Sequence, residues 1–211
     1  EDGVAALGWA VSNLDPSVSG KCESGVCESG PLRGADLSKC FLVGESAGGN
    51  IAHHVAARVA TATASFGASL TIKGVAALFP FFGSEERSAA ELRLGTRAVM
   101  LNYRMCDAAW RDFLPEGSGR DHPAANPGPD HESSSNLPPL FVTVGEYDIL
   151  KEHQVRFVEA RRRAGQSVHA RLYRGGIHCF HFFPQLRLTA QFHAHLAQFF
   201  LSCLALSDRG Q

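Results

Sequence analysis

Residues 40–60 constrain the fold of this chain more than any other part of the sequence. The apolar run at residues 40–44 predicts a buried strand, and residues 47–60 predict the helix that follows it. Between them, Gly44-x-Ser46-x-Gly48 fits the nucleophile-elbow pattern, in which a serine lies on a strained turn from strand to helix. Such a turn needs small residues on both sides of the serine, because a side chain there would clash with the strand or the helix. Taken alone, the pattern also fits an ordinary tight turn.

Apolar strands and helices alternate along the rest of the chain. We expect further strands at residues 70–79, 140–144 and 168–173, and further helices at residues 2–13, 85–113, 152–164 and 184–204. This alternation predicts an α/β fold with a mainly parallel sheet. The run Arg161-Arg162-Arg163 is expected to be a solvated helix end, where cations complement the helix dipole.

Composition narrows the class of protein. The chain has 211 residues, 45% of them hydrophobic, and a net charge of −1, which suits one globular domain with a sizeable core. Basic residues are not in excess, and no apolar run reaches the ~18 residues that a membrane span needs, so we expect neither a nucleic-acid nor a membrane partner.

The six cysteines match no zinc-binding spacing. Cys22 and Cys27 lie in a Gly/Ser-rich stretch and could form a disulfide under oxidising conditions. Cys40 and Cys203 lie in apolar runs, where a buried free thiol is expected. We expect no metal and no organic cofactor.

A serine nucleophile needs a base, and the base needs an acid to orient it. In this fold class the three follow in the order serine, acid, histidine. Asp148 comes just after the strand at 140–144, and His178 comes just after the strand at 168–173, where such folds gather their functional groups. Asp148 could instead only cap the next helix. Glu146 is the rival acid, and His181 is the rival histidine.

These segments together resemble the plant carboxylesterase family, which also contains the gibberellin receptors and belongs to the hormone-sensitive-lipase-like branch of the α/β-hydrolases. The resemblance runs almost from end to end and rests on the helix at residues 2–9, the elbow at 40–52, Pro80-Phe81-Phe82-Gly83, Asp121-His122-Pro123, Gly145-x-x-Asp148-x-Leu150 and Gly175-x-x-His178-x-Phe180. Aspartate is the commoner residue in the family at the position of Glu45.

The resemblance implies hydrolysis of a small-molecule carboxylic ester. Ser46 would attack the acyl carbon, His178 would move the proton, Asp148 would orient the imidazole, and the Ala47 N–H would donate to the oxyanion. It also suggests Phe81, Phe82 and Ile149 as substrate-binding residues.

One departure from the family is that its His-Gly-Gly-Gly loop and the first strands of its sheet do not occur in this sequence. We therefore expect residues 1–211 to be the C-terminal portion of a single α/β-hydrolase domain, truncated at its N-terminus, with a helical cap insertion at about 85–115. The strand at residues 40–44 would then have an unpaired edge. Two other functions stay open: a hormone-binding receptor without turnover, although such receptors have lost the histidine retained here at 178, and an inactive truncated family member. A cytoplasmic location is expected, with the nucleus as an additional one; the natural substrate and the oligomeric state are not predicted.

Overall fold

The computed structural model describes residues 2–14, 35–61, 70–128 and 137–207. Its core is a four-stranded sheet of β1 (Cys40–Glu45), β2 (Ile72–Leu78), β3 (Leu140–Gly145) and β4 (Val168–Tyr173). The strands lie in the order β1-β2-β3-β4, and all neighbours are parallel. The predicted α/β fold with a parallel sheet is therefore confirmed. Within the described part of the chain, β1 is an edge strand that pairs only with β2.

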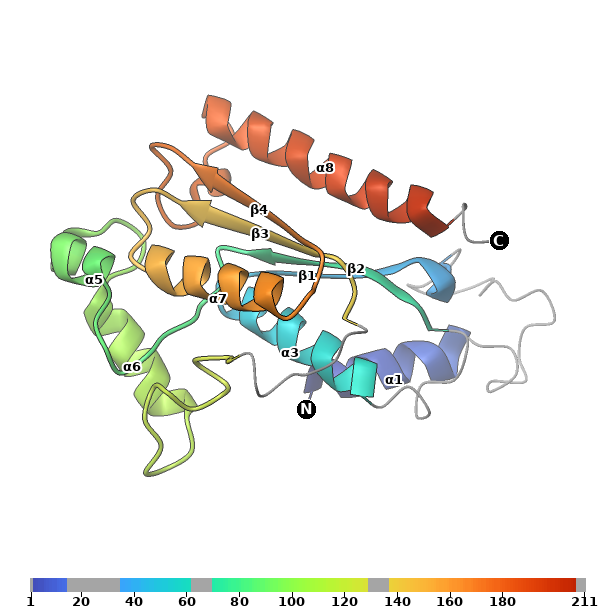
Figure 1. The fold of residues 1–211 in the computed structure, drawn as a ribbon, viewed down its shortest axis with the longest axis horizontal. Coiled ribbons are helices and arrows are strands. Elements are labelled where there is room, and N and C mark those ends of the chain that lie inside the picture. Colours follow the sequence, from blue (N-terminus) through green and yellow to red (C-terminus); the bar gives the residue numbers. More distant parts are fainter. Residues whose placement is uncertain (1, 15–34, 62–69, 129–136, 208–211) are drawn as a thin grey trace.

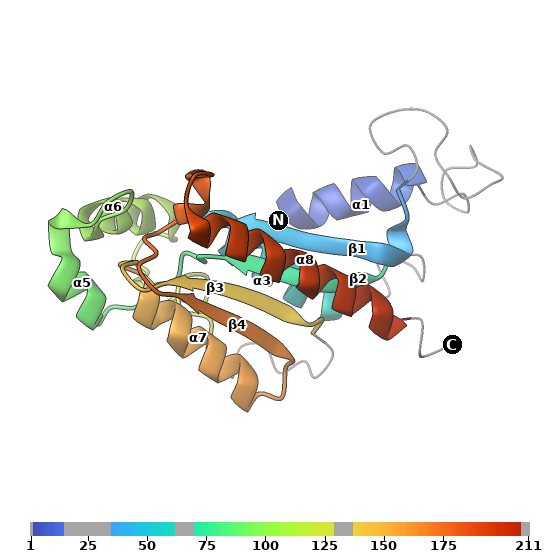
Figure 2. The same cartoon turned by 90° about the horizontal axis from the view of Figure 1, so that it is seen from above.

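Helices cover both faces of this sheet, as Figures 1 and 2 show. The helices α3 (Ala47–Thr61) and α7 (Lys151–Arg163) pack on one face, and the long helix α8 (Arg187–Ser207) packs on the other. The first helix, α1 (Asp2–Leu14), packs against α3 through Val11, Val55 and Val59. Because β2 and β3 are covered on both faces, they read as continuous apolar runs rather than as alternating ones.

The region expected to be helical over residues 85–113 divides into separate elements. These are α5 (Ala89–Leu94), the 3₁₀ turn η2 (Gly95–Arg97) and α6 (Tyr103–Phe113). Gly95 has a φ of 52°, which ends α5, and the Asn102 side chain accepts from the Met105 N–H to begin α6. Both helices lie beyond the carboxyl ends of the strands (Figure 2).

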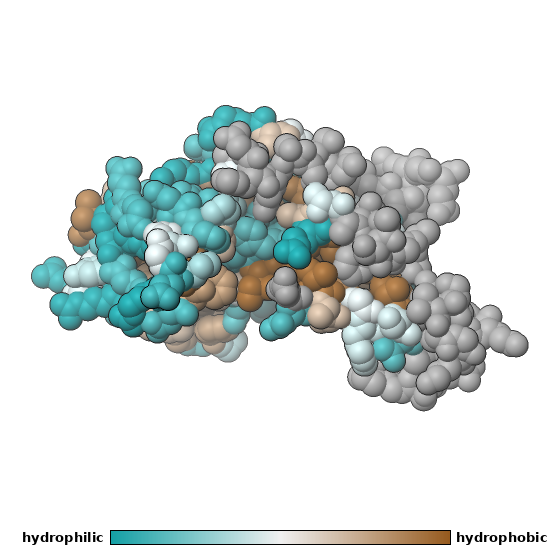
Figure 3. Space-filling view, turned by 90° about the horizontal axis from the view of Figure 1, so that it is seen from below, coloured by the Kyte–Doolittle hydropathy of each residue, from teal (hydrophilic) through white to brown (hydrophobic). Residues whose placement is uncertain are grey.

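Burial varies among the apolar side chains of this helical region. Trp110 is buried, but Leu92 and Phe113 are 73% and 63% exposed. Figure 3 shows the molecule from below, and on this face apolar residues gather near the middle. The end of the same face that carries α5 and α6 is largely hydrophilic.

Two further expectations are corrected. In the run expected to be a solvated helix end, Arg162 and Arg163 are exposed as expected. Arg161 is instead fully buried, where its guanidinium donates to the Gly128 carbonyl at 2.8 Å and lies over the Phe157 ring. Cys203 is a buried free thiol as expected, but Cys40, on the edge strand, is only half-buried. Cys22 and Cys27 lie outside the described residues. Among those residues, no helix is long and apolar enough to cross a membrane.

Candidate active site

The turn between β1 and α3 is a strained elbow with Ser46 at its apex. Ser46 has a φ of 51°, in the left-handed region that residues with a Cβ rarely adopt. Its N–H donates to the Leu78 carbonyl, and its own carbonyl accepts from the Phe81 N–H, both at 2.8 Å. These bonds hold the elbow against the end of β2, so the predicted strained turn at Ser46 is confirmed.

The small residues around the elbow have different reasons for being small. A Cβ on Gly44 would lie 2.0 Å from the Gly48 carbonyl oxygen, which no side chain can tolerate. A Cβ on Gly49 would come within 3.1–3.3 Å of Gly44 and Pro80. A Cβ on Gly48 meets nothing within 4 Å, so the prediction that the residue after the elbow must be small is wrong at Gly48. The crowded pair is Gly44 and Gly49.

Three side chains from three strand ends form one hydrogen-bonded chain at this elbow. His178 Nδ1 lies 2.8 Å from Asp148 Oδ2, and His178 Nε2 lies 3.0 Å from Ser46 Oγ. Because a carboxylate only accepts, Nδ1–H donates to Asp148, which leaves Nε2 free to accept from the serine hydroxyl. This geometry allows the imidazole to take the hydroxyl proton.

Asp148 is fully buried and held by two further donors. Its Oδ1 accepts from the Leu150 N–H at 2.9 Å, and its Oδ2 accepts from the Gln154 amide at 3.1 Å. Asp148 therefore stabilises the start of α7 as well as contacting His178. The rival acid, Glu146, accepts instead from the Gly175 N–H at 2.7 Å.

Gln154 is a residue of this site that the sequence motifs did not identify. It is fully buried, and its amide joins Asp148 to the Pro80 carbonyl, 3.3 Å away. No motif contains it, but a polar residue on the apolar side of an amphipathic helix is a signal that could have found it.

The electrostatics of His178 follow from its neighbours. Burial by itself lowers the pKa of this imidazole, but the hydrogen bond and charge of Asp148, with a contribution from Cys179, raise the pKa above its ordinary 6.5. The site therefore favours the imidazolium, the form that a base reaches after it has taken a proton.

An apolar pocket of about 130 Å³ opens beside the elbow, between α3 and α6. Its walls are Ala47, Asn50, Ile51, Phe81, Ala109, Trp110 and Phe113. Ala47 is the first residue of α3, where backbone N–H groups have no partner within the helix. Of the residues suggested for substrate binding, Phe81 lines this pocket. Phe82 packs in the core on Phe157, and Ile149 lies in the cluster behind Trp110.

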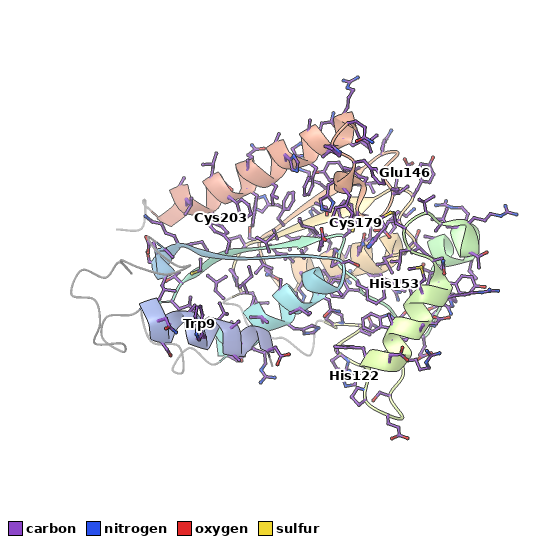
Figure 4. The ribbon with its side chains drawn as sticks, turned by 180° about the vertical axis from the view of Figure 1, so that it is seen from behind. Trp9, His122, Glu146, His153, Cys179 and Cys203 are labelled. Carbon is purple, nitrogen blue, oxygen red and sulfur yellow. The ribbon has the colours of Figure 1, made fainter. Side chains whose placement is uncertain are left out.

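A partly buried ionic cluster connects α5 and α6 to α7. Glu91 Oε2 accepts from His153 Nε2 at 3.0 Å, and Glu91 Oε1 accepts from Arg87 at 2.9 Å. Arg87 also pairs with Asp107 on α6. Although burial acts in the opposite direction, these bonds, together with that from the Ser88 N–H, lower the pKa of Glu91 to about 2. His153 lies on α7 toward the α5–α6 side in Figure 4, so the cluster helps to position α6 over the elbow.

Comparisons with known proteins agree with this architecture. A family model described as alpha/beta hydrolase fold, Abhydrolase_3, matches residues 1–182. Probable carboxylesterase 6 of Arabidopsis thaliana is 32% identical over 190 residues, which are 90% of this chain and 51% of that protein. Gibberellin receptor GID1C of the same plant is 34% identical over 171 residues, 80% of this chain and 44% of the receptor. The 3-O-acetylpapaveroxine carboxylesterase CXE1 of Papaver somniferum is 33% identical over 200 residues, 90% of this chain and 58% of that enzyme. The chain thus spans about half the length of the curated relatives it matches.

Solved structures share the fold. An esterase of Pyrobaculum calidifontis aligns with a TM-score of 0.74 at 24% identity, over 98% of this chain and 60% of that one. A bacterial heroin esterase aligns with a TM-score of 0.72 at 17% identity, over 95% of this chain and 58% of that one.

Proposed function

Since the chain belongs to the α/β-hydrolase family whose model it matches, we propose that it carries the catalytic residues of a serine carboxylesterase. The observation that carries this proposal is the hydrogen-bonded chain from Ser46 through His178 to Asp148, with distances of 3.0 and 2.8 Å. The names of two similar proteins, a probable carboxylesterase and a carboxylesterase, support the reaction class.

The geometry supports the following steps. Ser46 Oγ attacks the ester carbonyl carbon while His178 Nε2 takes the hydroxyl proton, and Asp148 stabilises the imidazolium that forms. The Ala47 N–H, at the start of α3, donates to the oxyanion, and the dipole of that helix adds to the effect. His178 then gives the proton to the leaving alcohol, and water hydrolyses the acyl-enzyme by the same steps.

We assign the pocket between α3 and α6 to the apolar part of the ester, with the segment at residues 85–115 acting as a cap. Phe81 and Trp110 stack with ring centroids 4.6 Å apart and form its rigid wall. A cavity of about 130 Å³ suits a short acyl or alkyl group rather than a long chain.

Labelling of the nucleophile tests the proposal without relying on fast turnover. We expect a fluorophosphonate to form a covalent adduct on Ser46 of the full chain, located by peptide mass spectrometry, and p-nitrophenyl acetate to be hydrolysed. Ser46→Ala should lose both, whereas Ser202→Ala, a matched change on α8, should keep both. Equal hydrolysis by wild type and Ser46→Ala, or labelling elsewhere than Ser46, would refute the assignment.

Pocket filling tests the substrate class. Ala109 is exposed on α6 and lines the pocket, so Ala109→Leu should fill it without disturbing the core. We expect kcat/KM for p-nitrophenyl butyrate to fall relative to acetate by about tenfold or more, since one methylene in an apolar pocket is worth about 1–3 kcal/mol. Ala108→Leu, one residue away and outside the pocket lining, is the control. An unchanged butyrate-to-acetate ratio in Ala109→Leu would contradict the assignment.

A further inference from the structure

We propose that Glu45, Cys179 and His181 form a binding site for a thiophilic divalent cation such as Zn²⁺, beside the proposed catalytic triad. One carboxylate oxygen, one thiol sulfur and one imidazole nitrogen from these residues lie within 4.8 Å of one another. Mixed sulfur, nitrogen and oxygen donors suit Zn²⁺, whereas Mg²⁺ and Ca²⁺ prefer oxygen alone. The spacing of the cysteines could not reveal this site, because Glu45 lies more than 130 residues before the other two ligands.

The ligands come from two elements that the sheet brings together. Glu45 is the last residue of β1, and Cys179 and His181 bracket the first residue of the 3₁₀ turn η4 (Phe180–Phe182). Cys179 lies at the carboxyl end of the sheet in Figure 4 and is 4% exposed. Its φ of 52° is a left-handed conformation that is unusual for a residue with a Cβ, and such outliers concentrate at functional positions.

His181 provides a second, independent sign of a ligand. Its Nε2 lies 2.9 Å from Glu45 Oε2 and donates to it, because the carboxylate only accepts. Its Nδ1 therefore carries a lone pair, and that atom is buried without a hydrogen-bond partner. Buried polar atoms are nearly always satisfied, so this unused lone pair, on one of the three residues of the cluster, is available to a ligand. The ring is also held rigidly, stacked on Phe79 at 5.4 Å between centroids.

The ligands themselves can supply the negative charge that a divalent cation needs. The Cys179 thiol gives its proton to solvent and binds as the thiolate, so no oxidant or reductant is needed. Thiolate and carboxylate together neutralise a divalent charge. Three protein ligands leave a fourth position for water, as in catalytic zinc sites. The Glu45 side chain is 43% exposed, which gives the ion a path from solvent.

Occupancy has a consequence that rests on the proposed esterase function. Glu45 directly precedes Ser46, and Cys179 directly follows His178. Catalytic groups must keep their productive geometry, and a cation that draws the Glu45 and Cys179 side chains together would displace the adjoining Ser46 and His178 from it. We therefore expect the cation to inhibit the esterase reversibly rather than to assist it.

Cobalt is the probe that reports the ligands directly. The full chain, with its thiols reduced, is titrated with Co²⁺, and a thiolate-to-metal charge-transfer band is expected, which Zn²⁺ then abolishes by displacing Co²⁺. Cys179→Ser should lose the band. Bound Zn²⁺ is measured by equilibrium dialysis: His181→Asn should lose one equivalent, whereas His193→Asn, an exposed histidine on α8, should keep it. Should His181→Asn fail to melt cooperatively, Glu45→Gln replaces it, with at least tenfold weaker binding expected.

Equal stoichiometry in His181→Asn and His193→Asn, or a cobalt band that survives Cys179→Ser, would overturn the proposal. These measurements need no substrate, so they are independent of whether the chain hydrolyses esters. If it does, Zn²⁺ should inhibit the wild type at concentrations that fill the site and should not inhibit His181→Asn in that range. Inhibition of both to the same extent would overturn the link between this site and activity.

Discussion

Gln154 offers the sharpest test of how the candidate site is built. Its side-chain amide donates both hydrogens, one to Asp148 Oδ2 at 3.1 Å and one to the Pro80 carbonyl at 3.3 Å. Pro80 directly precedes Phe81, whose N–H donates to the Ser46 carbonyl, so this one amide connects the acid to the elbow. Gln154→Met keeps the length and shape of the side chain and removes the donors.

The expected cost follows from the two bonds. A hydrogen bond to a charged group is worth about 1.5–3 kcal/mol, and one to a neutral carbonyl about 0.5–1.5 kcal/mol. The Gln154 Oε1 atom is itself buried without a hydrogen-bond partner, so its removal should raise the free energy of unfolding by about 1 kcal/mol. We therefore expect Gln154→Met to lower the free energy of unfolding by about 1–3.5 kcal/mol.

Gln166→Met is the matched control for this measurement. Its amide makes one bond, to the Pro138 carbonyl at 2.9 Å, and its Oε1 is also buried without a partner. Urea unfolding of the two variants thus isolates the bond to the carboxylate, and Gln154→Met should cost about 1.5–3 kcal/mol more than Gln166→Met. Equal costs would refute the reasoning that Gln154 stabilises the ionised Asp148.

The same variant has a readout that a purely structural role would not change. With one donor fewer, the Asp148 carboxylate holds the proton of His178 more tightly, so the pKa of His178 rises further. The pH dependence of kcat/KM in the proposed esterase should shift to higher pH in Gln154→Met and stay unshifted in Gln166→Met. A shift to lower pH would contradict the positioning role.

Three other predictions test the elbow, the base and the α5–α7 contact. Gly44→Ala should fail to give folded protein, because its Cβ would lie 2.0 Å from the Gly48 carbonyl oxygen. Gly48→Ala, whose Cβ would meet nothing within 4 Å, should melt at or above the wild-type temperature, and equal melting temperatures for the two variants would refute the clash. Although burial opposes the shift, Asp148 raises the pKa of His178 above 6.5, so kcat/KM should rise with pH to a midpoint above 6.5, and a midpoint below 6.5 would contradict this. The folding stability that protonated His178 contributes should be present below pH 6.5 and lost as pH rises through the pKa of the folded state. Against the effect of burial, His153 is the chief cause that lowers the pKa of Glu91 from 4.5 to about 2. The folding stability that ionised Glu91 contributes is therefore present above pH 4.5 and lost as pH falls toward 2. Urea unfolding should show the wild type losing roughly 2–3 kcal/mol more than Glu91→Gln across that range, and parallel losses in the two proteins would argue against this role.

Much of the fold could be predicted because local sequence signals agree with one another. The strand predicted at residues 168–173 has the same bounds in the structure, and the other strands and the long helices differ from their predicted bounds by a few residues at their ends. Covered strands need apolar runs and covering helices need apolar stripes, so both leave a pattern in the sequence. Residues 85–113 were harder, because Gly95 and Asn102 divide a region whose apolar side chains are partly exposed.

The sequence by itself determined the fold class and which residue types could react: a serine on a strained turn, then an acid, then a histidine, each just past a strand. Their order is a property of the chain, and parallel strands place their carboxyl ends at one edge. Only the tertiary structure decided which acid and which histidine meet. Asp148 reaches His178 while Glu146 reaches Gly175, and His181 turns to Glu45, because side chains two or three residues apart point in different directions. The same holds for Gln154 and for the Glu45–Cys179–His181 cluster, since hydrogen bonding and coordination depend on ångström distances between residues remote in sequence.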